Sequence, residues 1–220
     1  MNAKLKRLFK RRFINTEKVF CVGCNKTGTT SLEAALKDFG YLMGNQSVAE
    51  KLAVEGWGQR DFRRIIRYCR TAEAFQDLPF SMPYTYQALD AAFPRSKFIL
   101  TIRDSSEQWY SSITRFHAKL WGKNGRIPNK EDLQEAAYGE VGMAWRINRL
   151  SFTSPEDDPY RKEDLIEHYE RHNATVMEYF RHRPNDLLVI NVAEGGAYRK
   201  LCEFLEKPCL RETFSWKNKT

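Results

Sequence analysis

The sequence predicts an α/β fold, a three-layer domain in which helices flank a parallel sheet and a helical cap or insertion is added. Three observations predict this class. Apolar segments of strand length alternate with segments of helical periodicity, and two of the strand segments are near-continuous aliphatic runs. A third is a glycine-containing loop that joins the first strand segment to the first helical one. Together they indicate a sheet that is covered on both faces.

Four segments are predicted as buried strands, and they lie at residues 18–23, 72–76, 97–102 and 186–191. The third reads KFILTI and the fourth DLLVIN, as is typical of strands in a parallel sheet. Helices are predicted between them at 29–39, 61–70, 84–92 and 106–120, since each segment has helical spacing without internal proline. Such alternation predicts right-handed crossovers and a ligand site at the carboxyl ends of the strands.

Residues 127–183 interrupt this alternation with helix-rich sequence. Helices are expected over 130–149 and 162–182, with the turn-rich SFTSPEDDPY between them. Because the last strand arrives only afterwards, we interpret 127–183 as a helical insertion within a single domain that spans 18–220. A basic N-terminal arm, 1–17, precedes that domain.

The distribution of charge along the chain indicates which partners to expect. The formal net charge is +8, and the first 18 residues supply +6 of it. A nucleic-acid-binding domain would carry its surplus on the folded body, so no nucleic acid is expected. The arm MNAKLKRLFKRRF is a candidate for peripheral membrane contact, and a solvated terminus is the alternative. We expect neither a secretory signal nor a membrane span.

Cysteine and histidine usage predicts no metal site. Five cysteines, an odd number, favour a reducing compartment, and hence a cytoplasmic location, over a disulfide framework. Cys21 and Cys24 form a C-x-x-C, but no second ligand pair has zinc spacing. His168 and His172 have the i, i+4 spacing of a metal pair, yet we expect them on a solvated helix face.

The stretch VFCVGCNKTGTTSLEAAL predicts a phosphate-binding loop. Gly23 and Gly28 have the spacing of a P-loop, but the lysine lies inside the loop at Lys26 and not at position 29. A helix N-terminus offers N–H donors and partial positive charge to an anion, and Thr29 and Thr30 add hydroxyls. The alternative is an ordinary strand-to-helix turn.

A second strand-to-helix junction, KFILTIRDSSEQWYSSI, places Arg103 at the strand end. Asp104 or Ser105 is the expected N-cap, and Gln108 completes a capping box. Ser111 lies two helical turns after Asp104, so Arg103 and Ser111 are predicted to bind one anion.

On these residues the sequence resembles the sulfotransferases that use 3′-phosphoadenosine 5′-phosphosulfate (PAPS), in a non-cytosolic or bacterial-type branch. That family has a K-S/T-G-T-T loop for the 5′-phosphosulfate and, at a later strand end, an arginine followed eight positions on by serine for the 3′-phosphate. The resemblance implies that Arg103 and Ser111 bind the 3′-phosphate. It implies that the 5′-phosphosulfate is bound by Asn25, Lys26, Thr27, Gly28, Thr29 and Thr30.

The resemblance also implies a catalytic pair. Asp77-Leu78-Pro79 stands where cytosolic members have H-L-P, so Asp77 is the expected general base, the alternative being a strand-ending role. Lys26 is expected to neutralise the leaving 5′-phosphate.

The expected activity is transfer of a sulfuryl group from PAPS to a hydroxyl of a carbohydrate, lipid or small metabolite, without metal and with adenosine 3′,5′-bisphosphate as product. There are departures, since Ser31 replaces a tryptophan and the C-terminal G-x-x-G-x-x-K is missing, which leaves the adenine contacts unassigned. An ATP-dependent small-molecule kinase of P-loop type and a catalytically inactive nucleotide-binding module stay open as alternatives.

Overall fold

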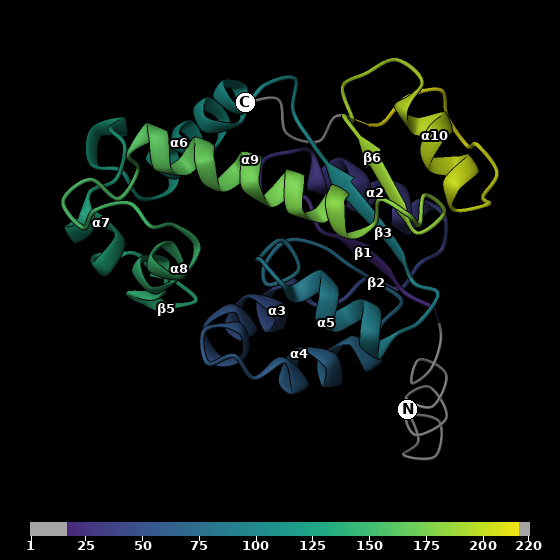
Figure 1. Cartoon of the computed structure of the whole chain (residues 1–220). Helices are drawn as coiled ribbons and strands as arrows, with labels where there is room; N and C mark the ends of the chain where they lie inside the picture. The colour runs from purple at the N-terminus through teal and green to yellow at the C-terminus, as the bar shows by residue number, and fades with distance from the viewer. Residues whose placement is uncertain (1–16, 216–220) are drawn as a thin grey trace. The chain divides into compact units, whose positions relative to one another are not determined.

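The computed structural model describes residues 17–215 (Figure 1). These residues form two compact units. The first unit runs to Ile102 and resumes at Val176, and the second is Arg103–Thr175. The two units do not test the expectation of one domain over 18–220, which stays a prediction. Apart from Glu17, the predicted basic arm lies outside the described residues. Within 17–215, no helix combines the length and apolarity that crossing a membrane requires.

The first unit contains a four-stranded parallel sheet with the order β2-β1-β3-β6. The α/β fold and all four predicted strands are confirmed, although each strand is shorter than expected. Because β1 lies inside the sheet, with β2 on one side and β3 on the other, its carboxyl end is where ligands bind in such folds. The strands are β1 (Val19–Cys21), β2 (Ala74–Phe75), β3 (Lys97–Thr101) and β6 (Leu187–Ile190).

Alternation along the strands separates the core of this unit into two layers. One face of the sheet packs against α2 (Thr29–Asp38) and α10 (Ala197–Phe204), through Leu32, Tyr198 and Leu201. The other face is aromatic, since Phe20 lies 5.7 Å from Phe75 between ring centroids. This period of two, with helices beyond both faces, gives the three layers that were expected. The aromatic face also includes Phe80, Phe93, Phe98 and Phe180.

Along the chain, the segment from β1 to β3 contains further helices of the first unit. The predicted helices at 29–39, 61–70 and 84–92 are confirmed, the second of them ending in a 3₁₀ turn. A helix that was not predicted begins after Asn45, whose side-chain oxygen caps it by accepting from the Val48 N–H at 3.2 Å. These elements are α3 (Gln46–Leu52), the π-helix η1 (Ala53–Trp57), α4 (Phe62–Tyr68), the 3₁₀ helix η2 (Cys69–Thr71) and α5 (Thr85–Ala92).

The second unit is mainly helical, and the predicted helix at 106–120 is confirmed as α6. The continuous helix expected over 130–149 is wrong, because a short hairpin divides it. Gly139 and Gly142 have φ values of 72° and 77°, a left-handed conformation that turns the chain out of a helix. The elements are α6 (Ser106–Trp121), the 3₁₀ helix η3 (Lys123–Gly125), α7 (Lys130–Glu135), β4 (Ala137–Tyr138), β5 (Glu140–Val141), α8 (Met143–Ser151) and α9 (Lys162–Tyr179), whose last turn enters the first unit.

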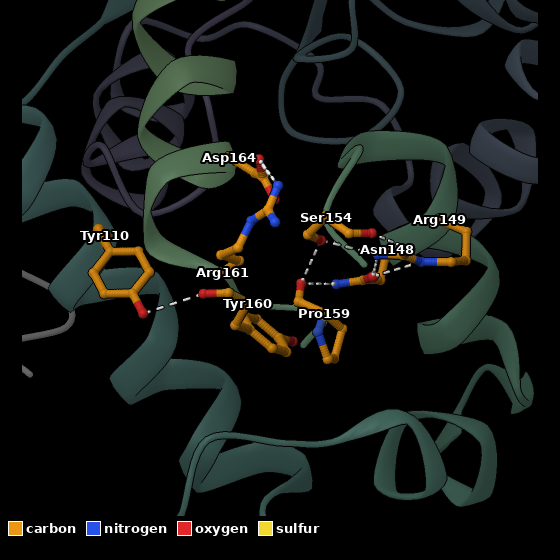
Figure 2. Close-up of polar contacts among 8 residues, drawn as sticks. All are labelled: Tyr110, Asn148, Arg149, Ser154, Pro159, Tyr160, Arg161 and Asp164. Atoms are coloured by element: carbon orange, nitrogen blue, oxygen red, sulfur yellow. Dashed lines mark hydrogen bonds and ion pairs between the residues drawn. The ribbon is translucent and has the colours of Figure 1, made fainter. Parts of the chain in front are cut away.

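The turn-rich segment between α8 and α9 is held by polar contacts (Figure 2). Asn148 Nδ2 and Ser154 Oγ both donate to the carbonyl oxygen of Pro159, at 3.1 and 2.9 Å. The Tyr110 hydroxyl of α6 donates to the Tyr160 carbonyl at 3.2 Å. Side chains of α6 and α8 therefore satisfy carbonyl groups that a helix or sheet would otherwise bond.

The expectation of a solvated face for His168 and His172 is wrong, since both side chains are buried. Phe152 packs edge-on against His168 at 5.0 Å, and burial lowers the pKa of His168 to about 3 because it disfavours the imidazolium. Among residues 17–215, no three histidine, cysteine or acidic side chains gather in a way that could hold a metal ion.

Substitution of Gly23 is expected to destabilise the first unit. A Cβ at this position would lie 2.3 Å from Thr101 Oγ1 and 2.5 Å from the Thr101 carbonyl oxygen, so β3 would have to shift. We expect Gly23→Ala to lower the free energy of unfolding by about 3 kcal/mol, measured by denaturant titration. Gly195→Ala is the matched control, because a Cβ there meets nothing within 4 Å. Equal losses in the two variants would contradict the expectation.

Candidate functional site

The loop between β1 and α2 is fastened to the sheet by Thr27. This residue is fully buried, and its hydroxyl donates to the Cys24 carbonyl at 2.6 Å. It also lies 2.6 Å from the hydroxyl of Thr101 on β3. Thr27 therefore anchors the loop with its side chain, and its predicted contact with a donor stays a prediction.

Three backbone amides at the start of α2 are available to an anion. The N–H groups of Gly28, Thr29 and Thr30 have no hydrogen-bond acceptor within residues 17–215, and no side chain caps the helix. Unsatisfied amides at a helix N-terminus carry partial positive charge. Lys26 precedes them in the same loop, in a left-handed conformation with φ 70°. The loop thus combines a lysine with the donors of a phosphate site.

Asp77 follows β2, and the structure brings it together with this loop through Asn25. The side chain of Asn25 hydrogen-bonds to the Asp77 carboxylate. The Leu78 N–H donates to Asp77 Oδ1 at 2.8 Å, and Ser81 Oγ donates to Asn25 Oδ1 at 3.3 Å. Because Asn25 Oδ1 accepts from Ser81, the Asn25 amide N–H faces the carboxylate. The candidate base and the predicted phosphate loop therefore share one hydrogen-bond network.

Crowding by protein atoms raises the pKa of Asp77 to about 6, chiefly because it removes water from the carboxylate. The negative charges of Glu50 and Glu33 raise this pKa further, whereas the hydrogen bonds from Leu78 and Asn25 lower it. A carboxylate with a pKa near neutrality is suited to accept a proton from an alcohol.

Arg103 and Ser111 belong to the second unit. The Arg103 N–H donates to the Tyr169 hydroxyl at 2.9 Å, and the ring of Tyr169 stacks on Trp109 with centroids 4.7 Å apart. Burial lowers the pKa of the Arg103 guanidinium, while Tyr169 and Asp104 oppose that shift. Ser111 is exposed on α6. The role of both residues as ligands of one anion stays a prediction.

The start of α6 is capped by Ser105, one of the two N-cap residues that the sequence predicted, but the predicted capping box is not formed. Ser105 is the N-cap, and its hydroxyl accepts from the Gln108 N–H at 3.1 Å. The Gln108 side chain closes on Asp104, donating to Asp104 Oδ2 at 2.8 Å and accepting from the Asp104 N–H at 3.1 Å. This cap fixes where α6 begins and thereby the position of Arg103 two residues earlier.

Sequence reasoning did not identify three kinds of residue that support the site. Thr101 is a polar residue inside the aliphatic run KFILTI, and that contrast was a usable signal. Ser81 carries no comparable signal. Glu33 and Glu50 affect Asp77 only through the folded arrangement of α2 and α3.

This geometry defines an α/β protein of P-loop-like fold. A lysine-containing loop follows the central strand β1, and a carboxylate of raised pKa follows the neighbouring edge strand β2. A family model described as a sulfotransferase domain matches residues 18–220, so the chain belongs to the sulfotransferase family. The resemblance seen in the sequence is thereby confirmed. A search of curated proteins finds no match to the chain.

Proposed function

We propose that this sulfotransferase takes its sulfuryl group from PAPS and transfers it to an acceptor hydroxyl, releasing adenosine 3′,5′-bisphosphate. The observation that carries the proposal is the set of amides of Gly28, Thr29 and Thr30, which lack acceptors within residues 17–215 and follow Lys26. Such a cradle fits the 5′-phosphosulfate, together with the side chains of Asn25, Lys26, Thr29 and Thr30.

Two side chains of the loop network carry the proposed chemistry. The acceptor oxygen attacks sulfur, its proton passes to the Asp77 carboxylate, and the bond between sulfur and the bridging oxygen breaks. The negative charge that develops on the 5′-phosphate is stabilised by Lys26 and by the helix amides. Asn25 contacts Asp77 and so positions the base next to the loop.

We propose Arg103 and Ser111 as ligands of the 3′-phosphate. Arg103→Ala should weaken adenosine 3′,5′-bisphosphate binding by roughly ten- to a hundredfold, because a charge-assisted hydrogen bond is lost. Binding of adenosine 5′-phosphate should change little, and calorimetry with both ligands measures the difference. Arg171→Ala, which removes an exposed arginine of the same unit, is the control. Equal losses for both nucleotides would reject this assignment.

Two measurements test the donor and the reaction. Calorimetry should show tighter binding of adenosine 3′,5′-bisphosphate than of ATP with magnesium, and labelled PAPS should yield sulfated product with an acceptor pool from cell extract. Tighter binding of ATP, with indifference to a 3′-phosphate, would favour a kinase. Binding of the bisphosphate without product in any pool would indicate an inactive module.

The proposal includes a cytoplasmic location, with the arm 1–17 as a candidate membrane contact and a carbohydrate, lipid or small metabolite as acceptor. The cysteines support a reducing compartment, since all five are free and four are buried. Burial raises the pKa of Cys21 and of Cys24 to about 12, which keeps both thiols protonated and unreactive.

A further inference from the structure

An open groove runs along α6 in the second unit, with a volume of about 540 Å³. Ser111, Arg115 and Lys119 line it from the helix, and Gly125 and Ile127 line it from the segment that follows. This volume lies within the usual range of small-molecule sites. Among residues 17–215, no acidic side chain lines the groove.

Arg115 and Lys119 differ from the neighbouring cations, because the described part of the chain offers their side chains no partner. Within residues 17–215 neither side chain forms an ion pair, a hydrogen bond or a ring contact. Lys123, close by in sequence, pairs with Glu135 at 2.9 Å, and Arg126 pairs with the buried carboxylate of Asp132. The groove therefore presents two uncompensated positive charges to solvent.

The spacing of these residues limits what the groove fits. Ser111, Arg115 and Lys119 follow each other at intervals of four, so they share one face of α6. At about 1.5 Å of rise per residue, Lys119 lies about 12 Å beyond Ser111 along the helix axis. A single phosphate group is too small to reach both ends, whereas an extended anion can.

We propose that this groove binds the anionic part of an extended acceptor, an alcohol that carries carboxylate, sulfate or phosphate groups, such as an acidic oligosaccharide. The inference rests on the proposed function, in which Ser111 contacts the donor. The charged part of the acceptor lies along Arg115 and Lys119 within the second unit.

The test uses labelled PAPS with cell-extract acceptors that are first separated on an anion-exchange resin. Label should enter the retained, anionic fraction. In the double variant Arg115→Gln/Lys119→Gln the KM for that fraction should rise about tenfold, with unchanged affinity for adenosine 3′,5′-bisphosphate and unchanged thermal stability. Added salt should raise the wild-type KM and affect the double variant less. Lys162→Gln, which removes an exposed charge of the same unit, should behave as wild type.

Three outcomes would overturn the proposal. The first is label only in the unretained, neutral fraction, and the second is an unchanged KM in the double variant. The third is a loss of nucleotide affinity in the double variant, which would assign the groove to the donor. A second readout needs no turnover. Titration with a disulfated disaccharide should shift the amide NMR signals of Arg115, Lys119 and Gly125 in the wild type and not in the double variant. Sulfation of no pool at all would contradict the proposed function, whereas absent shifts would contradict the groove.

Discussion

Lys26→Met is expected to lower kcat for sulfuryl transfer by about 10²–10³-fold. Methionine keeps a similar length and the same backbone preference but removes the charge that is proposed to stabilise the leaving phosphate. The amides of Gly28, Thr29 and Thr30 persist in this variant, so affinity for adenosine 3′,5′-bisphosphate should fall much less than kcat. Steady-state rates with labelled PAPS and calorimetry with the bisphosphate separate the two effects.

Lys51→Met is the matched control, because Lys51 is an exposed lysine in α3 with no ion pair within residues 17–215. It should leave both kcat and nucleotide affinity unchanged. A Lys26→Met enzyme that keeps wild-type kcat would remove this lysine from the chemical step. A loss of nucleotide affinity as large as the loss of kcat would mean that Lys26 contributes equally to the ground state and the transition state.

Asp77→Asn is expected to slow turnover at least about 100-fold while nucleotide affinity is retained. Asparagine fits the site because it also adopts the left-handed conformation, φ 65°, that Asp77 has. Its oxygen can still accept from the Leu78 N–H. In the wild type, kcat/KM should fall as the pH drops through about 6, since the carboxylate of the free enzyme must be ionised to accept a proton. The residual rate of the variant should not depend on pH in this range. An identical pH profile in the wild type and the variant would exclude Asp77 as the base.

The same substitution should stabilise the fold above pH 6. The pKa of Asp77 is raised in the folded protein from 3.8 to about 6, so the folded state binds more protons than the unfolded state between these values. The contribution of the neutral carboxyl is fully present below about pH 4 and is lost as the pH rises through 6. Asp77→Asn should therefore gain about 1–3 kcal/mol at pH 7 and little at pH 3.5, measured by denaturant titration.

The sheet could be predicted from the sequence because its strands are apolar runs whose signal is local. KFILTI and DLLVIN became β3 and β6, and the loop at Lys26 follows β1 as expected. The N-cap of α6 was also predictable, since Ser105 is a capping residue type that directly precedes a helical pattern. Short-range patterns of this kind need no tertiary information.

Other features depend on tertiary contacts that no local pattern reports. The pKa of Asp77 depends on Glu33 and Glu50, which come from separate helices. His168 appeared to be polar surface among charged neighbours, yet its side chain is buried beside Phe152. The break in the helix expected over 130–149 was signalled by Gly139 and Gly142, but helical spacing around them outweighed that signal.

The hydroxyl contact between Thr27 and Thr101 has a thermodynamic consequence for the proposed binding of a nucleotide. A loop that is already tied to a central strand loses its conformational entropy when the chain folds, and not when a ligand arrives. Preorganisation of this kind would favour rapid binding of the proposed donor with little movement of the loop.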